Sequence, residues 1–375
     1  MKIAIYLFLS LIYFFGNLLF AQQNTSKEHK IVGYVFGDLM EKAENPVQAE
    51  KLTHLNYAFA KIENGKISIT NEDDPKHFKT LNKLKSINPS LKLLISVGGW
   101  SNTASFPSIA SSDSTRTRFA NSTLQFLKKY KLDGIDLDWE AHKNNGSTPF
   151  FPEYKENFTL LLAKIRQKLD SFSAKTNNHY LLTVATPPNP TYLKNVEIDQ
   201  IAKIADFVNI MCYDFHDDWN TSTCHHTNLL ISLAEPKNQK QSTALVVKNY
   251  IESGADPKKL VIGAAFYGRG WKKVTPVNNG LYQPAKGQSF ALNYIAIKDS
   301  LRSGKYHRYW DEEAKAPYLW NAKDKIFISY DDPVSLEKKA EFIKKENLGG
   351  AMFWQYHADD GELLESLYRN LKNGN

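Results

Sequence analysis

Residues 133–140 read Asp-Gly-Ile-Asp-Leu-Asp-Trp-Glu and alternate carboxylates with bulky apolar side chains. Successive side chains of an extended strand point to opposite faces, so Asp136, Asp138 and Glu140 should share one face. The Ile, Leu and Trp between them would pack on the other face. An edge strand with three solvated acids is the alternative, and the size of the apolar residues argues against it. We therefore predict a strand that is buried on one side and carries chemistry on the other.

The spacing of the three carboxylates also predicts an unusual protonation state. Alternate residues of a strand lie roughly 6–7 Å apart. Three acids at that spacing cannot all stay charged in a poorly solvated place, so at least one proton should be retained near neutral pH. A proton held on Glu140 would make this residue a general acid.

Eight short β-rich runs recur along the 375-residue chain, and amphipathic stretches with apolar residues three and four apart lie between several of them. Strands that alternate with helices indicate parallel βαβ units, and eight such strands predict an α/β fold with a closed (β/α)8 TIM barrel. Active sites of this architecture lie at the C-terminal ends of the strands, and Glu140 follows the fourth run. The predicted strands are Lys30–Phe36, His54–Phe59, Lys92–Val97, Gly134–Trp139, Tyr180–Ala185, Phe207–Tyr213, Leu260–Tyr267 and Gly350–Gln355. The predicted helices include Thr115–Lys129, Tyr154–Ser171, Ser242–Ser253 and Leu336–Glu346.

The gap between the seventh and eighth runs is too long for a single helix. From Trp271 to about Ile326 the sequence is rich in Gly, Pro, Tyr and Lys, and its aromatic content argues against a disordered excursion. We expect a small α+β insertion over residues 272–326, within a catalytic barrel formed by residues 28–271 and 327–375. Such an insertion would form a wall that deepens a cleft at the barrel mouth.

The first residues have the character of a signal peptide. Lys2 precedes an apolar run from Ile3 to Phe20, and Ala21 resembles a cleavage site. The run is nearly long enough to span a bilayer, so a single membrane anchor is the alternative. Its brevity, the small residue at its end and the polar residues that follow favour removal of residues 1–21. We expect a protein secreted to the extracellular space or the periplasm, with no membrane attachment after cleavage.

Charge and cysteine content argue against several other classes. The formal net charge is +7, but no dense Lys/Arg run interleaves with aromatic residues, so we expect no nucleic-acid partner. Cys212 and Cys224 could form a disulfide in an oxidising location, although Cys212 lies inside an apolar run. Cys224, His225 and His226 lack a second ligand pair and indicate a loop more than a metal site. We expect neither a metal nor a cofactor.

Other predicted strand ends carry residues suited to binding a polar ligand. Residues 96–100, Ser-Val-Gly-Gly-Trp, close the third run, and paired glycines permit close approach of the backbone. Residues 211–214, Met-Cys-Tyr-Asp, close the sixth run and place a Tyr hydroxyl beside an acid. Aromatic and cationic side chains follow the seventh run, and Trp354 in the eighth could form an aromatic floor. Core packing explains each feature alone, but not their joint placement at strand ends.

These motifs resemble those of glycoside hydrolase family 18, the chitinases and their relatives. Residues 133–140 fit the D-x-x-D-x-D-x-E signature completely, and residues 96–99 resemble the S-x-G-G element. Residues 211–214 and 266–271, together with Trp354, also match, so the resemblance covers nearly the whole mature chain. The long gap after Trp271 resembles the inserted domain of the family branch with a deeper cleft.

The resemblance implies a secreted chitinase that cuts β-1,4 linkages between N-acetylglucosamine units with retention of configuration. Glu140 would protonate the glycosidic oxygen while the 2-acetamido carbonyl of the sugar attacks the anomeric carbon, which gives an oxazolinium intermediate. Asp138 would orient the acetamide and share a proton with Asp136, and Tyr213 would hold the acetamide oxygen. Chitin or chito-oligosaccharide is then the expected partner, and we expect a monomer.

The resemblance also assigns residues that bind the substrate. Trp354 would lie beneath the distorted sugar. The other assigned residues would line nearby subsites or stack there: Tyr34, Phe59, Gly98, Gly99, Trp100, Met211, Asp214, Trp219, Tyr267 and Arg269. Two positions depart from the family pattern: Ala141, where an aromatic residue is often found, and Cys212, where a small residue is common.

Two other functions fit the same signature. An endo-β-N-acetylglucosaminidase acting on N-linked glycans would use the same acid and the same acetamido group, but the insertion and the aromatic content favour a linear polymer. A sugar-binding lectin would bind without turnover, and the presence of Glu140, Asp138 and Asp136 argues against it.

Overall fold

The computed structural model of the chain describes residues 29–40, 46–100, 102–140, 154–216, 221–237 and 240–372. The expected signal peptide over residues 1–21, Ala141 and Trp219 lie outside these ranges. Within the described ranges, no helix combines the length and the apolar character that crossing a bilayer requires.

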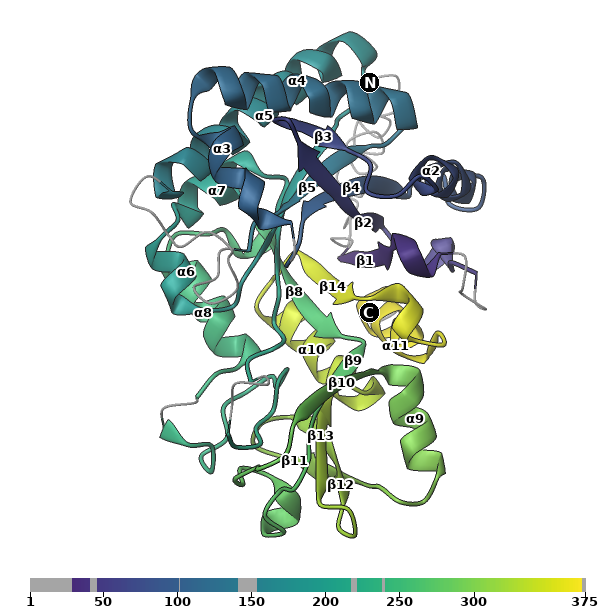
Figure 1. Cartoon of the computed structure of the whole chain (residues 1–375), viewed down its shortest axis with the longest axis vertical. Coiled ribbons are helices and arrows are strands. Elements are labelled where there is room, and N and C mark those ends of the chain that lie inside the picture. Colours follow the sequence, from purple (N-terminus) through teal and green to yellow (C-terminus); the bar gives the residue numbers. More distant parts are fainter. Residues whose placement is uncertain are drawn as a thin grey trace, which may run out of the picture.

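Eight parallel strands form a closed barrel, as the alternating sequence pattern predicts (Figure 1). Each strand pairs with its neighbours in chain order, and β1 pairs with both β14 and β2, which closes the sheet. A short β3 (Lys66–Ser68) extends β2 as an antiparallel hairpin. The (β/α)8 TIM barrel is therefore confirmed. Its strands are β1 (Lys30–Phe36), β2 (His54–Glu63), β4 (Lys92–Gly98), β5 (Gly134–Asp138), β6 (Leu181–Thr186), β7 (Phe207–Ile210), β8 (Leu260–Ala265) and β14 (Gly350–Trp354).

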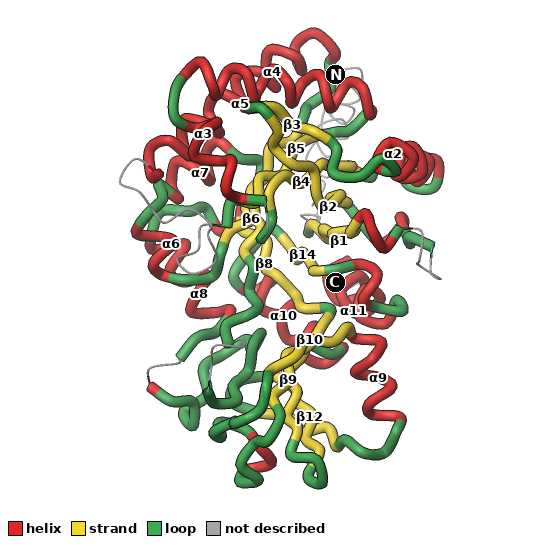
Figure 2. The backbone as a smooth tube through the Cα atoms, viewed as in Figure 1, coloured by secondary structure: helices red, strands yellow, loops and turns green. Residues whose placement is uncertain are grey.

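Helices cover the outside of the barrel (Figure 2). Local sequence sets where some of them begin and end. Ser112 and Thr115 form a capping box at the start of α4, and Lys131 follows its last turn in the left-handed conformation. Asp332 and Ser335 form the same kind of cap on α10. The helices are α2 (Asp74–Lys83), α3 (Phe106–Ala110), α4 (Asp113–Tyr130), α5 (Tyr154–Thr176), α6 (Pro190–Lys194), α7 (Ile198–Ile204), α8 (Thr243–Glu252), α10 (Pro333–Lys345) and α11 (Glu362–Lys372).

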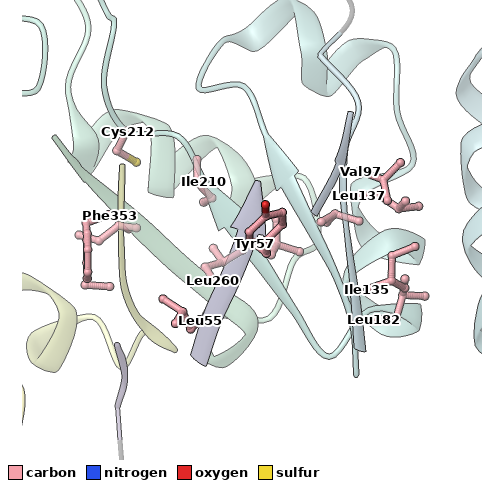
Figure 3. Close-up of a cluster of buried hydrophobic side chains, with 14 of the residues drawn as sticks. Leu55, Tyr57, Val97, Ile135, Leu137, Leu182, Ile210, Cys212, Leu260 and Phe353 are labelled. Carbon is pink, nitrogen blue, oxygen red and sulfur yellow. The ribbon is translucent and has the colours of Figure 1, made fainter. Parts of the chain in front are cut away.

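The main apolar core lies between the barrel strands and these helices. Figure 3 shows Ile135 and Leu137 of β5 near Val97 of β4 and Leu182 of β6, and all four are fully buried. Because the side chains of a strand alternate, the acids of β5 point to the barrel interior instead. The period-two pattern of residues 133–140 thus reflects an apolar outer face and an acidic inner face.

A five-stranded antiparallel sheet follows β8 in the sequence and forms the lower part of the molecule in Figure 1. Its strand order is β10-β9-β13-β12-β11, and its own apolar cluster contains Trp271, Tyr318, Trp320 and Phe327. The elements of this sheet span residues 267–330, a range that includes the residues 272–326 expected for the insertion. Its elements are β9 (Tyr267–Trp271), β10 (Ser289–Asn293), α9 (Tyr294–Arg302), β11 (His307–Asp311), β12 (Ala316–Asn321) and β13 (Ile326–Tyr330).

Two sequence runs differ from the strands they predict. β7 ends at Ile210 rather than Tyr213, because Cys212 and Tyr213 donate to the carbonyls two residues before them and so leave the sheet. The run Leu260–Tyr267 is divided between two sheets, since β8 ends at Ala265 and β9 starts at Tyr267. Both differences occur at the C-terminal end of the barrel, where the chain turns into the loops that line the cleft.

Candidate active site

A cleft of about 1100 Å³ opens at the C-terminal ends of the barrel strands. Predicted site residues from distant parts of the chain face this one cavity. Those that line it are Glu140, Asp138, Tyr213, Tyr34, Phe59, Gly98, Gly99, Trp100, Met211, Asp214, Tyr267, Arg269 and Trp354. Asp136 is fully buried inside the barrel and does not line the cleft, and Trp219 is not among the described residues.

Asp136 is the acceptor at the centre of a polar network inside the barrel. Its Oδ2 accepts hydrogen bonds from the hydroxyls of Tyr34 and Ser96, both at 2.8 Å. Its Oδ1 accepts from Thr183 Oγ1 at 2.5 Å and from Asn209 Nδ2 at 3.3 Å. Burial raises the pKa of Asp136, and these four donors oppose the rise because they favour the charged form. The network fixes the carboxylate in one orientation.

Asp138 is the next inward-facing residue of β5 toward the cleft. Its side chain is buried, and its Oδ1 has no hydrogen-bond partner among the described residues. Burial, followed by the charges of Glu140 and Asp136, raises the pKa of Asp138 well above its usual range. The protonated form of Asp138 is therefore favoured relative to an exposed aspartate. The spacing of the three acids predicts that at least one of them retains a proton, and the raised pKa of Asp138 agrees with that expectation.

Glu140 is half-buried at the surface of the cleft, while the backbone that carries it is anchored by aromatic packing. Trp139 lies on the opposite face, where it stacks on Phe106 with ring centroids 5.0 Å apart. The centroid of the Trp139 ring also lies 4.3 Å from that of Tyr154 and 5.2 Å from that of Phe158. Glu140 thus faces the cleft from a strand end that aromatic packing holds in place.

Close contact between β4 and β5 explains the paired glycines. Gly98 has a φ of +110°, and a Cβ at this position would overlap the carbonyl oxygen of Asp138. The N–H of Gly99 donates to that same carbonyl at 2.9 Å. A Cβ on Gly99 would lie 2.7 Å from the ring of Phe59. These glycines let β4 approach the acidic strand end.

Trp354 forms an aromatic floor with residues of the first two strands. Its ring stacks on Phe59 with centroids 5.7 Å apart and 21° between the planes. Its ring centroid also lies 5.8 Å from that of Tyr34 and 6.2 Å from that of Phe36. Large aromatic faces at a cleft provide apolar area against which the flat face of a sugar ring can pack.

The antiparallel sheet contributes to the cleft through Arg269 of β9. Asp214 has a φ of 55°, and its Oδ1 accepts a hydrogen bond from Arg269 Nε at 2.8 Å. Nδ1 of His226 lies 3.5 Å from the same oxygen. Burial alone would raise the pKa of Asp214, but His226 and Arg269 hold it below its usual range. Tyr213 packs edge-on against Tyr267 at 5.9 Å, so the loop after β7 and the start of β9 form one wall.

Several cleft residues have no place among the predicted ones. Phe36 and Gln355 are the last residues of two predicted strands, so their position is a signal that could identify them. The β10 residues line the cleft from a strand that no run of the sequence indicates. The additional lining residues are Phe36, Asn102, Ala185, Pro187, Pro188, Asn189, Phe215, Gln241, Ala291, Leu292, Asn293, Met352, Gln355 and Ala358.

The cysteine and histidine residues of the loop after β7 have structural partners. Nε2 of His225 lies 3.2 Å from Asp311 Oδ2, and the His226 ring contacts Tyr267 at 5.2 Å. No three His, Cys, Asp or Glu side chains in the described ranges are grouped so that they could hold a metal ion. Cys212 and Cys224 are both buried, and no disulfide joins them.

Comparisons with known sequences point in the same direction as this geometry. The family model for glycosyl hydrolases family 18 matches residues 22–359. Chitinase A1 of Niallia circulans is 41% identical over 301 residues, which cover 76% of this chain and 43% of that protein. Chitotriosidase-1 of Mus musculus is 32% identical over 318 residues, which cover 82% of this chain and 67% of that protein.

Solved structures share the architecture. A glycoside hydrolase family 18 N-acetylglucosaminidase from Paenibacillus barengoltzii matches with a TM-score of 0.83 at 36% identity, over 91% of this chain and 99% of that one. Chitinase ChiA74 from Bacillus thuringiensis matches with a TM-score of 0.87 at 31% identity, over 92% of this chain and 70% of that one. Sequence and fold comparisons thus agree with the resemblance that the motifs carry.

Proposed function

This chain belongs to glycosyl hydrolases family 18, and from this premise we propose that it is a secreted chitinase. The proposed reaction is hydrolysis of β-1,4 linkages between N-acetylglucosamine units, with retention of configuration at the anomeric carbon. The observation that carries the proposal is the buried Asp138, with a raised pKa, beside Glu140 where β5 meets the cleft. Relatives named as chitinases, from Niallia circulans and Aphanocladium album, support the substrate class.

Glu140 acts first as a general acid. Its proton passes to the glycosidic oxygen, and the bond from C1 to that oxygen breaks with its electron pair going to the leaving sugar. The carbonyl oxygen of the 2-acetamido group attacks C1 from the opposite face and forms an oxazolinium ion. Water then attacks C1 as the Glu140 carboxylate takes its proton, which reopens the ring and restores the acid.

The arrangement of carboxylates favours a nucleophile that the substrate supplies. A retaining enzyme with two catalytic carboxylates holds them about 5 Å apart on opposite sides of the scissile bond. Asp138 and Glu140 instead occupy alternate positions of one strand end and face the cleft from the same side. The raised pKa of Asp138 also favours its protonated form, which is a poor nucleophile. A sugar with a 2-acetamido group removes the need for a second carboxylate.

Asp138 and Asp136 control the charge behind the reacting acetamide. The Oδ1 atom of Asp138 can accept a hydrogen bond from the acetamide N–H, because the described residues leave it without a partner. In the proposed cycle, Asp136 begins charged, because its hydrogen-bond donors favour that form. The proton then moves from Asp138 to Asp136, which leaves the negative charge on Asp138, next to Glu140. Negative charge at this place stabilises the positive oxazolinium ion.

Tyr213 and Trp354 hold the reacting sugar in the proposed complex. The Tyr213 hydroxyl lies 3.8 Å from Met352 Sδ, a weak acceptor that the acetamide oxygen can replace as a better one. Trp354 supports the sugar ring from below. Asp214 and its partner Arg269 lie in the wall formed by the loop after β7 and the start of β9. Together these groups would orient the acetamide carbonyl toward C1.

Export and domain organisation complete the proposal. A polymeric substrate outside the cell agrees with a removable signal peptide at residues 1–21. We propose that residues 272–326 form an insertion that deepens the cleft of the barrel, and that the protein acts as a monomer without a cofactor.

A second candidate activity is release of single N-acetylglucosamine units. The likeness to an N-acetylglucosaminidase over 99% of that chain favours it. Endo-β-N-acetylglucosaminidase action on N-linked glycans is a third candidate, because it uses the same acid and acetamido group. A product-length profile from a long chito-oligosaccharide, alongside incubation with an N-glycosylated protein, separates the three activities.

The proposed function is tested with a chromogenic chitobioside. Wild-type protein should release the chromophore, and Glu140→Gln, which cannot donate the proton, should lose activity by several orders of magnitude. A wild-type protein that binds chito-oligosaccharides without cleaving them would overturn the chitinase proposal and leave the lectin function.

A further inference from the structure

A buried ion pair lies outside the cleft, and the proposed chemistry does not use it. Lys339 of α10 contacts Asp331, which follows β13, with Nζ 2.6 Å from Oδ2. The two side chains are only 2% and 1% exposed. Neither residue lines the cleft.

The Asp331 carboxylate connects four parts of the fold. Its Oδ2 also accepts from the backbone N–H of Ala265, the last residue of β8, at 3.0 Å. Oγ1 of Thr227, in the loop after β7, lies 3.1 Å from the same Asp331 oxygen. Oδ1 accepts from Ser335 of α10 at 2.7 Å. β8, β13, α10 and the loop after β7 therefore meet at one buried charge.

Thr227 extends this network toward the cleft. Lys339 Nζ donates to the Thr227 hydroxyl at 2.7 Å, and that hydroxyl donates to the carbonyl of Cys212 at 3.0 Å. Cys212 lies between Met211 and Tyr213, both of which line the cleft. Its side chain is buried in the outer core (Figure 3), so the chain at Cys212 is held by both its side chain and its carbonyl.

Neighbouring contacts hold the same loop against β13. The N–H of His226 donates to Ser329 Oγ at 2.9 Å, and the N–H of Phe215 donates to the carbonyl of His226 at 3.1 Å. Ser329 is only two residues before Asp331. The position of the loop that carries Tyr213 and Asp214 is therefore set relative to one end of β13.

An ion pair at this place is a poor source of stability. The cost of removing two charges from water largely offsets their attraction, and apolar residues of similar volume often stabilise a fold as well or better. The charges add direction instead, because each hydrogen bond in the network restricts the geometry of its partners. A directional anchor next to the wall of the cleft indicates a positioning role.

We propose that the Lys339–Asp331 pair positions the Met211–Asp214 segment for catalysis, with Thr227 as the connecting residue. This inference rests on the proposed function, since Tyr213 and Asp214 are the groups that are positioned. Lys339 and Asp331 touch no substrate. They act on the rate because a misplacement of about 1 Å in a reacting group can lower a rate by about 100-fold.

The double variant Lys339→Met/Asp331→Asn tests the proposal, because it removes both charges and leaves neither one buried alone. Asn at position 331 can still accept from Ala265. We expect a melting temperature within about 5 °C of wild type. On chromogenic chitobioside, kcat should fall about 10- to 100-fold while KM changes less than about threefold. Lys338→Met is the matched control: Lys338 pairs with Glu341 at the surface of the same helix, so kcat and KM should stay unchanged.

Substitutions at Thr227 separate positioning from packing. Thr227→Val keeps the shape of the side chain but removes the hydroxyl, whereas Thr227→Ser keeps the hydroxyl. We expect Thr227→Val to lose about 10-fold in kcat and Thr227→Ser to retain activity within about threefold. A side chain that only fills space would give the opposite order, because Ser leaves the larger gap.

Two results would overturn the inference. One is a folded double variant with wild-type kcat and KM. The other is a loss of activity that is fully explained by the fraction of unfolded protein, so that kcat per folded molecule is unchanged. If the wild-type protein cleaves no chito-oligosaccharide, the proposed function fails instead. Crystal structures of both proteins then decide the inference: it predicts that Tyr213 and Asp214 shift by more than about 0.5 Å in the double variant, and a smaller shift refutes it.

Discussion

The hydroxyl of Tyr34 donates a hydrogen bond to Oδ2 of Asp136 at 2.8 Å, although the two residues are 102 positions apart in the sequence. They meet because β1 and β5 are strands of the same closed barrel, and both side chains point into its interior. This bond favours the charged form of Asp136, which lies next to Asp138 on the inner face of β5, where the pKa of Asp138 is raised. The Tyr34 ring also contacts Trp354, so one residue links the acids to the aromatic floor.

Tyr34→Phe removes the donor and keeps the ring against Trp354. We expect kcat on chitobioside to fall about 10-fold with a smaller change in KM, because a hydrogen bond to a charged group contributes about 1.5–3 kcal/mol. Tyr57→Phe is the control, since the Tyr57 hydroxyl is also buried but donates to Asp74 on the outer side of the barrel. Tyr57→Phe should lower stability and leave kcat intact. Equal effects of the two substitutions on kcat would contradict the role of Tyr34.

Asp138→Asn should lower turnover by orders of magnitude while it spares much of the binding, because the proposed role of Asp138 is to stabilise the charge that develops in the transition state. Steady-state kinetics and calorimetric binding of a chito-oligosaccharide measure the two effects. Asp133→Asn is the control: Asp133 lies at the other end of β5, where it accepts from the Leu93 N–H and pairs with Lys85. Equal losses of affinity and rate in Asp138→Asn would contradict this role.

Asp138→Asn should also raise the free energy of unfolding near neutral pH. Asp138 has a raised pKa in the folded protein and an ordinary pKa of about 3.9 in the unfolded chain. Below about pH 4 Asp138 is protonated in both the folded and the unfolded state, so its titration does not lower the free energy of unfolding. Above that pH the folded state retains a proton that the unfolded state releases, and the free energy of unfolding falls as the pH rises toward the folded-state pKa. Asn does not titrate. Thermal melts should therefore show Asp138→Asn above wild type at about pH 8, and a difference that shrinks toward about pH 4. A difference independent of pH would contradict the raised pKa of Asp138.

Gly98→Ala should disturb the site through the backbone. A Cβ at Gly98, where φ is +110°, would overlap the Asp138 carbonyl oxygen. Gly304 offers a control, since its φ is +68° and a Cβ there meets no described atom within 4 Å. Gly304→Ala should cost about 1 kcal/mol and leave kcat unchanged. Gly98→Ala should cost more and lower kcat. Denaturant unfolding and kinetics measure both, and equal costs would argue against a requirement for close approach of β4 to β5.

The fold follows from patterns that are local in the sequence. The period-two alternation of residues 133–140 predicts β5 and its acidic face, and the β-rich runs predict the other barrel strands. Local patterns fail where the chain leaves the sheet. β7 ends at Ile210 because backbone bonds within residues 210–213 replace the ladder, and no apolar periodicity records this change. Phe266 likewise separates two strands that belong to different sheets.

The residues proposed to react are predictable because each stands at or next to a strand end, but their hydrogen-bond partners are not. Asp136 is bonded by Ser96, Thr183 and Asn209, which come from three other strands. Their meeting depends on the closure and stagger of the barrel, which a single sequence does not encode locally. The contact between Lys339 and Asp331 is hidden for a different reason. A lysine on an amphipathic helix normally predicts a solvated face, and only the packing of α10 turns this one inward.

The stereochemistry of the first product tests the central claim most directly. Proton NMR during hydrolysis of a chito-oligosaccharide reports the anomer of the newly formed reducing end before mutarotation. An acetamido nucleophile and water attack C1 in succession from opposite faces, so the account predicts the β-anomer, formed by wild type and not by Glu140→Gln. Initial release of the α-anomer would mean a single attack by water and would contradict substrate-assisted catalysis at this site.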